Sequence, residues 1–152
     1  MRIFCDTNVI TEFLEKRLQY GFVARILALP SDKYELHISE GGFYTITFLI
    51  DRQLRRLEIY NPERLAKERK ALLRILATFH VACAGKEGLR CGVLDPNFKD
   101  LEDSYQYQAA LNCKADALLT INIKDFKNVL DGPLPILTPE DFVAQYIDNS
   151  KE

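Results

Sequence analysis

The stretch that decides the fold is Arg2-Ile3-Phe4-Cys5-Asp6-Thr7-Asn8, at the start of the chain. Its first four residues are β-prone, whereas Asp, Thr and Asn favour turns and helix caps over strand interiors. The stretch therefore predicts a short strand that carries Asp6 at its C-terminal end. Because sites in open parallel sheets form beyond the carboxyl ends of the strands, Asp6 becomes the first candidate for a functional residue.

The same succession of strand and helix recurs along the chain. Further short strands are predicted at 34–38, 80–83, 115–120 and 135–137. Apolar residues at helical spacing, together with capping residues, predict helices at 9–14, 22–27, about 43–57, 61–78, 99–113, from 121 and from 138. Gly41-Gly42 is interpreted as a turn and residues 85–96 as a loop with room for one turn of helix. One apolar stripe is predicted on the fifth helix, through Leu101, Tyr105, Ala109, Ala110, Leu111 and Asn112. This alternation predicts an α/β domain, a three-layer α/β/α sandwich with a mainly parallel central sheet, over residues 1–147, followed by a loose tail at 148–152.

Length and composition restrict the class of protein. The chain has 152 residues, of which 47% are hydrophobic, enough for one continuous core. Its four cysteines are scattered and form no CxxC pair, which is typical of a reduced compartment. The sequence shows no signal-peptide pattern and no apolar run near the roughly 20 residues that span a bilayer. We therefore expect a soluble cytoplasmic protein with no membrane partner.

Charge is divided unevenly along the chain. The net charge of −2 excludes binding to polyanions through bulk charge. Between Arg52 and Arg74, however, the sequence contains eight basic and three acidic residues, so this stretch has a net charge of +5 and the rest of the chain −7. The basic stretch is either a solvated helical face or a local patch for RNA, with Arg52, Arg55 and Arg56 as the candidate RNA-binding residues.

Carboxylates and amides follow three of the predicted segments. They are Asp6 with Asn8, Asp100 with Asp103, and Asn122 with Asp125. Crowded carboxylates repel one another unless a cation neutralises them, and oxygen ligands suit Mg²⁺ or Mn²⁺. Taken singly, Asp6 is equally explained as a helix cap and Asp100 as a helix N-terminal charge. Their convergence at one sheet edge favours a metal site.

Three motifs in this order carry a resemblance to a known family. They are the opening segment 1–10, the acidic segment 97–110 (NFKDLEDSYQYQAA) and the segment 115–126 (ADALLTINIKDF), followed by a closing ILTPEDF at 136–142. Together they resemble the PIN-domain ribonucleases, and most closely the bacterial VapC-like toxin branch, over nearly the whole chain.

The resemblance implies an Mg²⁺- or Mn²⁺-dependent endoribonuclease that leaves 5′-phosphate and 3′-hydroxyl ends. Asp6, Asp103 and Asp125 match the catalytic acidic positions, and the implied metal-binding set adds Asn122, Asp100 and Glu40. Thr7, Asn8 and Thr120 correspond to supporting positions. The resemblance implies RNA and an antitoxin protein as partners. The apolar residues Phe43, Phe48, Leu49 and Ile50 exceed the needs of one small core, which favours a homodimer or a bound antitoxin segment.

Two positions depart from the family pattern. Many active members carry a Glu at the position that falls near Thr45, and relatives commonly have Arg where this chain has Ile121. The alternative function is therefore a catalytically degenerate PIN-like module that binds RNA or protein. A receiver-like phosphoacceptor domain is a weaker alternative, because it requires an acidic doublet after the first strand and this chain has the lone Asp6.

Overall fold

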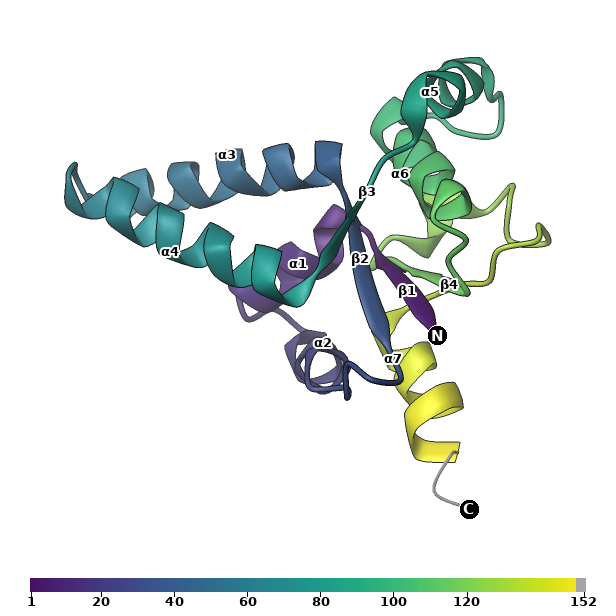
Figure 1. The fold of residues 1–152 in the computed structure, drawn as a ribbon, viewed down its shortest axis with the longest axis horizontal. Helices are drawn as coiled ribbons and strands as arrows, with labels where there is room; N and C mark the ends of the chain where they lie inside the picture. Colours follow the sequence, from purple (N-terminus) through teal and green to yellow (C-terminus); the bar gives the residue numbers. More distant parts are fainter. Residues whose placement is uncertain (150–152) are drawn as a thin grey trace.

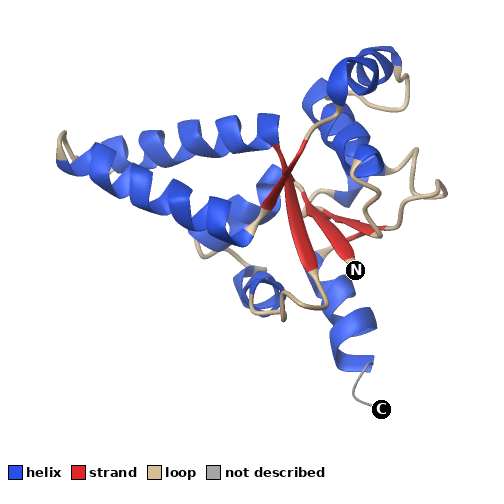
Figure 2. Ribbon diagram, viewed as in Figure 1, coloured by secondary structure: helices blue, strands red, loops and turns tan. Residues whose placement is uncertain are grey.

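A five-stranded sheet forms the centre of the computed structural model, which describes residues 1–149 (Figures 1 and 2). Its strands lie in the order β3-β2-β1-β4-β5, and every neighbouring pair is parallel. The strands are β1 (Arg2–Cys5), β2 (Glu35–Ser39), β3 (His80–Ala82), β4 (Ala117–Leu119) and β5 (Ile136–Leu137). Helices cover both faces, so the predicted α/β fold with a parallel sheet is confirmed.

The order of the strands places a topological switch at β1. The chain leaves β1 for β2 and β3 on one side, then returns to build β4 and β5 on the other. Asp6 directly follows β1, and its backbone N–H donates to the carbonyl of Leu119 at 2.9 Å. Since ligands in open α/β sheets bind where the strand order reverses, the fold puts Asp6 at the expected position for a site.

Alternation along β1 explains the two helical layers. Ile3 and Cys5 point to one face and Phe4 to the other, as successive residues of a strand do. The first face is covered by α1 (Thr7–Leu14), α2 (Tyr20–Leu27), α3 (Glu40–Arg56), α4 (Glu63–Thr78) and α7 (Pro139–Phe142), the last continuing into η2 (Val143–Asp148). The second face is covered by α6 (Leu101–Asn112) and η1 (Ile123–Phe126), and α5 (Gly85–Leu94) packs on α6.

Helices α3 and α4 meet near the turn that connects them, spread apart towards the sheet and project from it as an arm (Figure 1). Asp51 of α3 joins the two helices, because it accepts from Arg55 at 2.7 Å and from Arg64 of α4 at 3.1 Å. Two basic side chains of the +5 stretch thus share one carboxylate within the arm, so one of their two positive charges is neutralised.

The prediction of a loop at 85–96 was wrong, because residues 85–94 form helix α5. Its glycines permit close packing: a Cβ on Gly92 would lie 2.9 Å from Cδ1 of Tyr105 on α6. Ser104 also donates its hydroxyl to the carbonyl of Gly92 at 2.8 Å. Gly92 is therefore needed for contact with another helix, whereas in a single sequence such a glycine looks the same as a glycine in a loop.

The predicted turn at Gly41-Gly42 was wrong as well, and the predicted stripe on α6 was right only for Ala109 and Ala110. Helix α3 begins at Glu40, so both glycines lie in its first turn. On α6, Leu101 is 46% exposed, and the buried residues are Ser104, Gln106, Tyr107, Ala109 and Ala110. Polar residues occupy the buried face because they take part in buried hydrogen bonds, which apolar periodicity does not detect.

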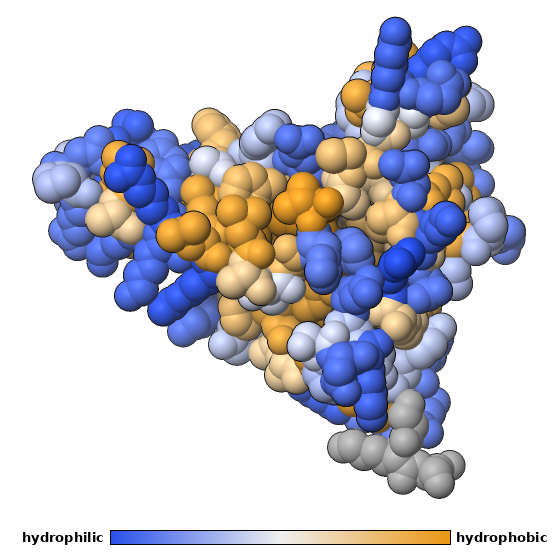
Figure 3. All heavy atoms as spheres, in the orientation of Figure 1, coloured by the Kyte–Doolittle hydropathy of each residue, from blue (hydrophilic) through white to orange (hydrophobic). Residues whose placement is uncertain are grey.

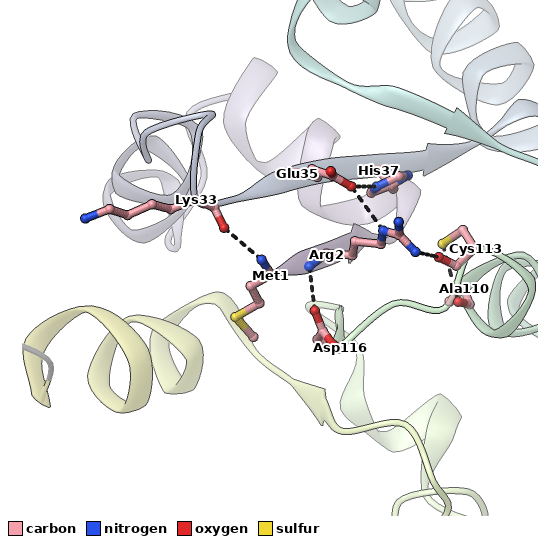
Figure 4. A network of polar contacts seen from close by, with 8 residues as sticks. All are labelled: Met1, Arg2, Lys33, Glu35, His37, Ala110, Cys113 and Asp116. Atoms are coloured by element: carbon pink, nitrogen blue, oxygen red, sulfur yellow. Dashed lines mark hydrogen bonds and ion pairs between the residues drawn. The ribbon is translucent and has the colours of Figure 1, made fainter.

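The amino ends of the strands are joined by Arg2, as Figure 4 shows. Its backbone N–H donates to Asp116 at 2.7 Å, its Nε donates to Glu35 at 3.1 Å, and its Nη1 donates to the carbonyl of Cys113 at 3.3 Å. This network links β1 to β2 and to the segment before β4 at the amino ends of the strands. The candidate residue Asp6 lies at the other, carboxyl ends of the strands.

At the other end of the chain, Asp148 ends η2 and pairs with Arg25 at 2.5 Å. The predicted tail at 148–152 therefore begins inside an ordered element, and its residues 150–152 lie outside the described part of the chain. None of the helices within residues 1–149 combines the length and apolar character that crossing a bilayer requires.

Candidate active site

Asp6 is held in a fixed orientation at the carboxyl end of β1. It is 2% exposed, and each carboxylate oxygen accepts one side-chain hydrogen bond. Gln106 of α6 donates to Oδ1 at 2.7 Å, and Thr120, which follows β4, donates to Oδ2 at 2.8 Å. Burial raises the pKa of Asp6, while these two hydrogen bonds oppose the rise. The pair of donors therefore presents a buried carboxylate in one defined position.

Asn8 connects this position to the segment after β4. Its Nδ2 donates to the Thr120 hydroxyl at 3.1 Å, and its Oδ1 accepts from the backbone N–H of Ile121 at 3.0 Å. The Thr120 hydroxyl also accepts from the N–H of Asn122 at 3.1 Å. Asn8 and Thr120 are thus joined by hydrogen bonds next to Asp6, and Thr7 follows Asp6 in the chain.

Gly42 lets α3 approach the same network. A Cβ at this position would lie 2.8 Å from Oγ of Ser39 and 2.9 Å from Oγ1 of Thr7. Ser39 caps α3 by accepting from the N–H of Gly42 at 2.8 Å, and the N–H of Thr7 donates to Oε1 of Gln106 at 3.1 Å. The absence of a side chain at Gly42 therefore allows the first turn of α3 to support the residues that hold Asp6.

Asp103 lies in the first turn of α6, partly buried and close enough to Asp6 to be affected by its charge. Burial, followed by the negative charges of Asp6, Asp100, Asp125 and Glu102, raises its pKa from 3.8 to about 7. Carboxylates from three separate segments of the chain therefore act on one another at this position. A positive charge would relieve both their repulsion and the desolvation of Asp103.

A pocket of about 360 Å³ opens beside Asp103, and Asp6 is not part of its lining. Asp100, Asp103 and Asp125 form its acidic part, and Lys99, Lys124, Lys127, Asn97 and Asn128 complete the lining. Asp100 caps α6 by accepting from the N–H of Glu102 at 2.8 Å, so its other oxygen remains free for a ligand. Asn122 immediately precedes η1, which carries Asp125. The pocket combines hard oxygen donors with lysines able to contact phosphate.

The donor set fits a hydrated divalent cation. Within residues 1–149 no three His, Cys, Asp or Glu side chains approach closely enough to enclose an ion directly. Mg²⁺ does not require such a cage, because it commonly keeps several waters and binds through one or two carboxylates. Asp103, with Asp100 and Asp125 at the rim, supplies that arrangement, and Asp6 adds its negative charge from outside the lining.

Several predicted residues lie elsewhere. The Glu40 carboxylate accepts from the hydroxyl of Tyr44 at 2.9 Å and from the thiol of Cys83 at 3.3 Å, outside the acidic pocket. Arg52, Arg55 and Arg56 lie in the last turns of α3, at the far end of the arm. Arg52 is about 10 Å along the helix from Thr45, the residue of α3 that contacts α6, because α-helices rise 1.5 Å per residue. None of the three arginines lines the acidic pocket.

Gln106 and Glu102 contribute to the site but were not among the predicted site residues. Gln106 is 3% exposed and binds Asp6, yet its signal in the sequence is only a polar residue within a helix. Glu102 accepts from the hydroxyl of Thr45 on α3 at 3.2 Å. This contact brings a carboxylate of α6 to Thr45, the position near which the family pattern has a Glu.

The sheet order, the switch point at Asp6 and the acidic pocket define a PIN-like α/β domain with a candidate metal-dependent site. No family model matches the chain. It is similar to Ribonuclease VapC1 of Aquifex aeolicus (strain VF5), with 27% identity over 150 residues that cover 95% of each chain. The predicted resemblance to VapC-like PIN domains is therefore confirmed.

Solved structures agree at the level of the fold. VapBC2 from Rickettsia felis, solved bound to a DNA fragment from its promoter, matches with a TM-score of 0.65 and 16% identity, over 91% of this chain and 98% of that one. VapBC-1 from nontypeable Haemophilus influenzae matches with a TM-score of 0.61 and 19% identity, over 92% of this chain and 99% of that one. FitAcB from Neisseria gonorrhoeae matches with a TM-score of 0.59 and 14% identity, over 91% of this chain and 98% of that one. The fold is thus shared along almost the entire length of each chain.

Proposed function

We propose that this protein is a divalent-metal-dependent endoribonuclease of the cytoplasm and the toxin of a toxin–antitoxin pair. The observation that carries the proposal is the convergence of Asp6, Asp103 and Asp125 from three segments at the switch point of the sheet. The similarity to Ribonuclease VapC1 supports the same chemistry.

The side chains take distinct roles in this proposal. Asp103 and Asp6 hold Mg²⁺ or Mn²⁺, with Asp100, Asn122 and Asp125 completing its shell directly or through water. The cation, when bound, neutralises charge on the phosphodiester and activates water for attack. Thr120 and Gln106 keep Asp6 in place, and Asn8 holds Thr120. Lys99, Lys124 and Lys127 orient the RNA backbone by charge.

Incubation of the purified protein with a mixed RNA pool tests the proposal. We expect cleavage in Mn²⁺ or Mg²⁺, none in EDTA, and products with 5′-phosphate and 3′-hydroxyl ends. Asp6→Asn and Asp103→Asn should each abolish most of the activity. Asp32→Asn, in the turn before β2 at the opposite edge of the sheet, is the matched control and should cleave like the wild type. RNA binding without cleavage under either metal would instead support the degenerate binding module.

The proposed antitoxin has an apolar surface available on the helical layer of α1, α2 and α4. A groove of about 200 Å³ lies there, lined by Ile10, Phe13, Leu14, Leu27, Ile75 and Phe79 among others. Leu73 and Leu76 of α4 and Val81 of β3 are exposed by 66%, 45% and 45%. Figure 3 shows apolar side chains gathered over this part of the molecule. The VapBC structures of the same fold support an antitoxin partner, and we keep the homodimer as part of the proposal.

The arm supplies the second RNA contact in the proposal. Arg52, Arg55 and Arg56 are exposed, although Arg55 is paired with Asp51 and Arg52 lies 5.7 Å from the centre of the Phe48 ring. Their distance from the acidic pocket restricts them to holding the RNA backbone away from the scissile bond.

A further inference from the structure

A second pocket, of about 630 Å³, lies on the other flank of α6 from the acidic pocket. The start of α3, the end of β3 and helices α5 and α6 enclose it, and Figure 1 shows these elements gathered at one edge of the sheet. Ser39 and Ala82, which end β2 and β3, form its floor. Because neighbouring strands are about 4.8 Å apart, this floor is one to two strand spacings from Asp6. We call it the tyrosine pocket.

The tyrosine pocket has a mainly apolar wall with few polar groups. Tyr44 and Tyr105 provide two aromatic rings, and Leu89, Ala84 and Ala109 provide aliphatic surface. Tyr105 is two residues beyond Asp103 on α6, so the wall of one pocket and the ligand of the other belong to the same helical turn. Unpaired RNA bases are recognised in this way, by stacking on aromatic side chains and hydrogen bonding along the Watson–Crick edge.

Glu40 is the acceptor in the tyrosine pocket. Its Oε1 accepts from Tyr44 and its Oε2 from Cys83, and both contacts favour the ionised carboxylate and lower its pKa. Each carboxylate oxygen has a second lone pair, so two adjacent acceptor positions remain. Among the four RNA bases, guanine alone presents two adjacent N–H donors, N1–H and the N2 amino group, on its Watson–Crick edge. Lys86, also in the lining, supplies a positive charge for a neighbouring phosphate.

We propose that the tyrosine pocket binds an unpaired guanine base of the RNA, close to the phosphodiester placed in the acidic pocket. Glu40 accepts from N1–H and the N2 amino group, while Tyr44 and Tyr105 contact the base. This inference rests on the proposed ribonuclease function and adds a preferred base to it. It also gives Glu40 a role in recognising substrate, in place of the metal-binding role that the family resemblance implies.

Binding in EDTA tests the inference without any cleavage. We would measure the fluorescence anisotropy of labelled uridine hexanucleotides that carry one central guanosine, or one inosine, which lacks the N2 amino group. The wild type should bind the guanosine oligomer roughly fivefold or more tightly than the inosine oligomer. Glu40→Gln should remove this discrimination, and Tyr44→Ala should weaken binding of both oligomers. Tyr60→Ala, which removes an exposed tyrosine at the tip of the arm, should retain wild-type discrimination.

A chemical readout uses the exposed cysteines and remains valid if a variant folds poorly. Cys83 lines the tyrosine pocket, whereas Cys91 is exposed outside its lining. Guanosine monophosphate should slow alkylation of Cys83 by iodoacetamide in the wild type and leave Cys91 unchanged, as resolved by mass spectrometry. Adenosine monophosphate should protect Cys83 less.

Three outcomes overturn the inference. The first is equal affinity of the wild type for the guanosine and inosine oligomers, and the second is discrimination that survives in Glu40→Gln. The third is protection of Cys83 by N-acetylarginine amide but not by guanosine monophosphate, because a guanidinium also offers paired donors and would mark the pocket as a site for a protein side chain. Cleavage without base discrimination contradicts this inference alone, whereas guanine binding without cleavage contradicts the proposed ribonuclease.

Discussion

The carboxylates of the acidic site fall into two groups that differ in how they are held. Asp6 is buried and accepts from both Gln106 and Thr120, whereas Asp100 and Asp125 are exposed at the rim of the pocket. Asp103 lies between them, partly buried and subject to the charge of the other three. The buried carboxylate of Asp6 is held in one position. The exposed carboxylates at the rim add negative charge, and their side chains are free to reorient towards a cation and its waters.

The largest expected effect comes from removing the buried carboxylate. Asp6→Ala leaves Gln106 Nε2 and the Thr120 hydroxyl without their acceptor, so we expect the free energy of unfolding to fall by about 1–3 kcal/mol. RNA cleavage should fall by about 100-fold or more. Asp125→Ala should reduce cleavage by roughly 10- to 100-fold with no change in thermal midpoint, because Asp125 is exposed. Equal loss of stability in both variants would contradict the distinction between the two groups.

A paired glycine substitution examines the support behind Asp6. Gly42→Ala places a Cβ within 3 Å of the Ser39 and Thr7 hydroxyls, so we expect lower stability and reduced cleavage. Gly41→Ala is the matched control in the same helical turn, where an added Cβ meets nothing within 4 Å. It should be neutral or slightly stabilising, because Ala favours helix over Gly. Denaturant unfolding of both variants measures the difference, and identical midpoints would show that the close approach of α3 has no energetic consequence.

Asp103 makes the stability of the metal-free protein depend on pH. Its pKa of about 7 in the folded protein exceeds its ordinary value near 3.8, so the folded state binds more protons between these values. The contribution of Asp103 to the free energy of unfolding is therefore fully present below about pH 4 and is lost as the pH rises towards 7. Asp103→Asn should remove this component and become more stable than the wild type at pH 8 in EDTA. The difference between the stability–pH curves of the wild type and Asp103→Asn isolates the effect of Asp103. It removes the effect of His37, whose pKa is lowered by burial, so that its protonation makes stability rise with pH instead of fall.

The smallest effect is expected from the basic arm. Replacing Arg52, Arg55 and Arg56 with Ala should weaken RNA binding modestly and lower the slope of log K against log salt by about 0.7 for each phosphate that the arm no longer neutralises. Cleavage of short RNA should not change, because the arm lies away from the acidic pocket. An unchanged salt slope would assign these side chains to the solvated surface of the arm.

The order of strands and helices was predictable because each element carries its own local signal. The capping residues Asp6, Ser39 and Thr138 follow strands, and apolar periodicity marks most helices. Helix α5 was missed because its Gly92 has a tertiary purpose, the contact with Tyr105, that local propensity cannot reveal. The same reason explains Gly42, whose contacts lie with Thr7 and Ser39.

The candidate site was predictable in part. The residues Asp6, Asp103 and Asp125 follow from motif order and strand ends, and the structure brings their charges together. Gln106 was missed because a buried polar side chain resembles a surface residue in a single sequence, and its role depends on a partner 100 positions away. Glu40 and the arm arginines were placed in the predicted site by proximity in sequence or charge, and the fold directs them elsewhere.

Titration with Mn²⁺, followed by electron paramagnetic resonance of the free ion, tests most directly whether the two groups of carboxylates form one cation site. The wild type should bind Mn²⁺ with an affinity that rises as the pH increases through about 7, because protons compete for Asp103. Asp103→Asn and Asp6→Asn should bind at least about 10-fold more weakly, while Asp32→Asn should match the wild type. Equal Mn²⁺ affinity in all four proteins would contradict a cation site built on Asp6 and Asp103.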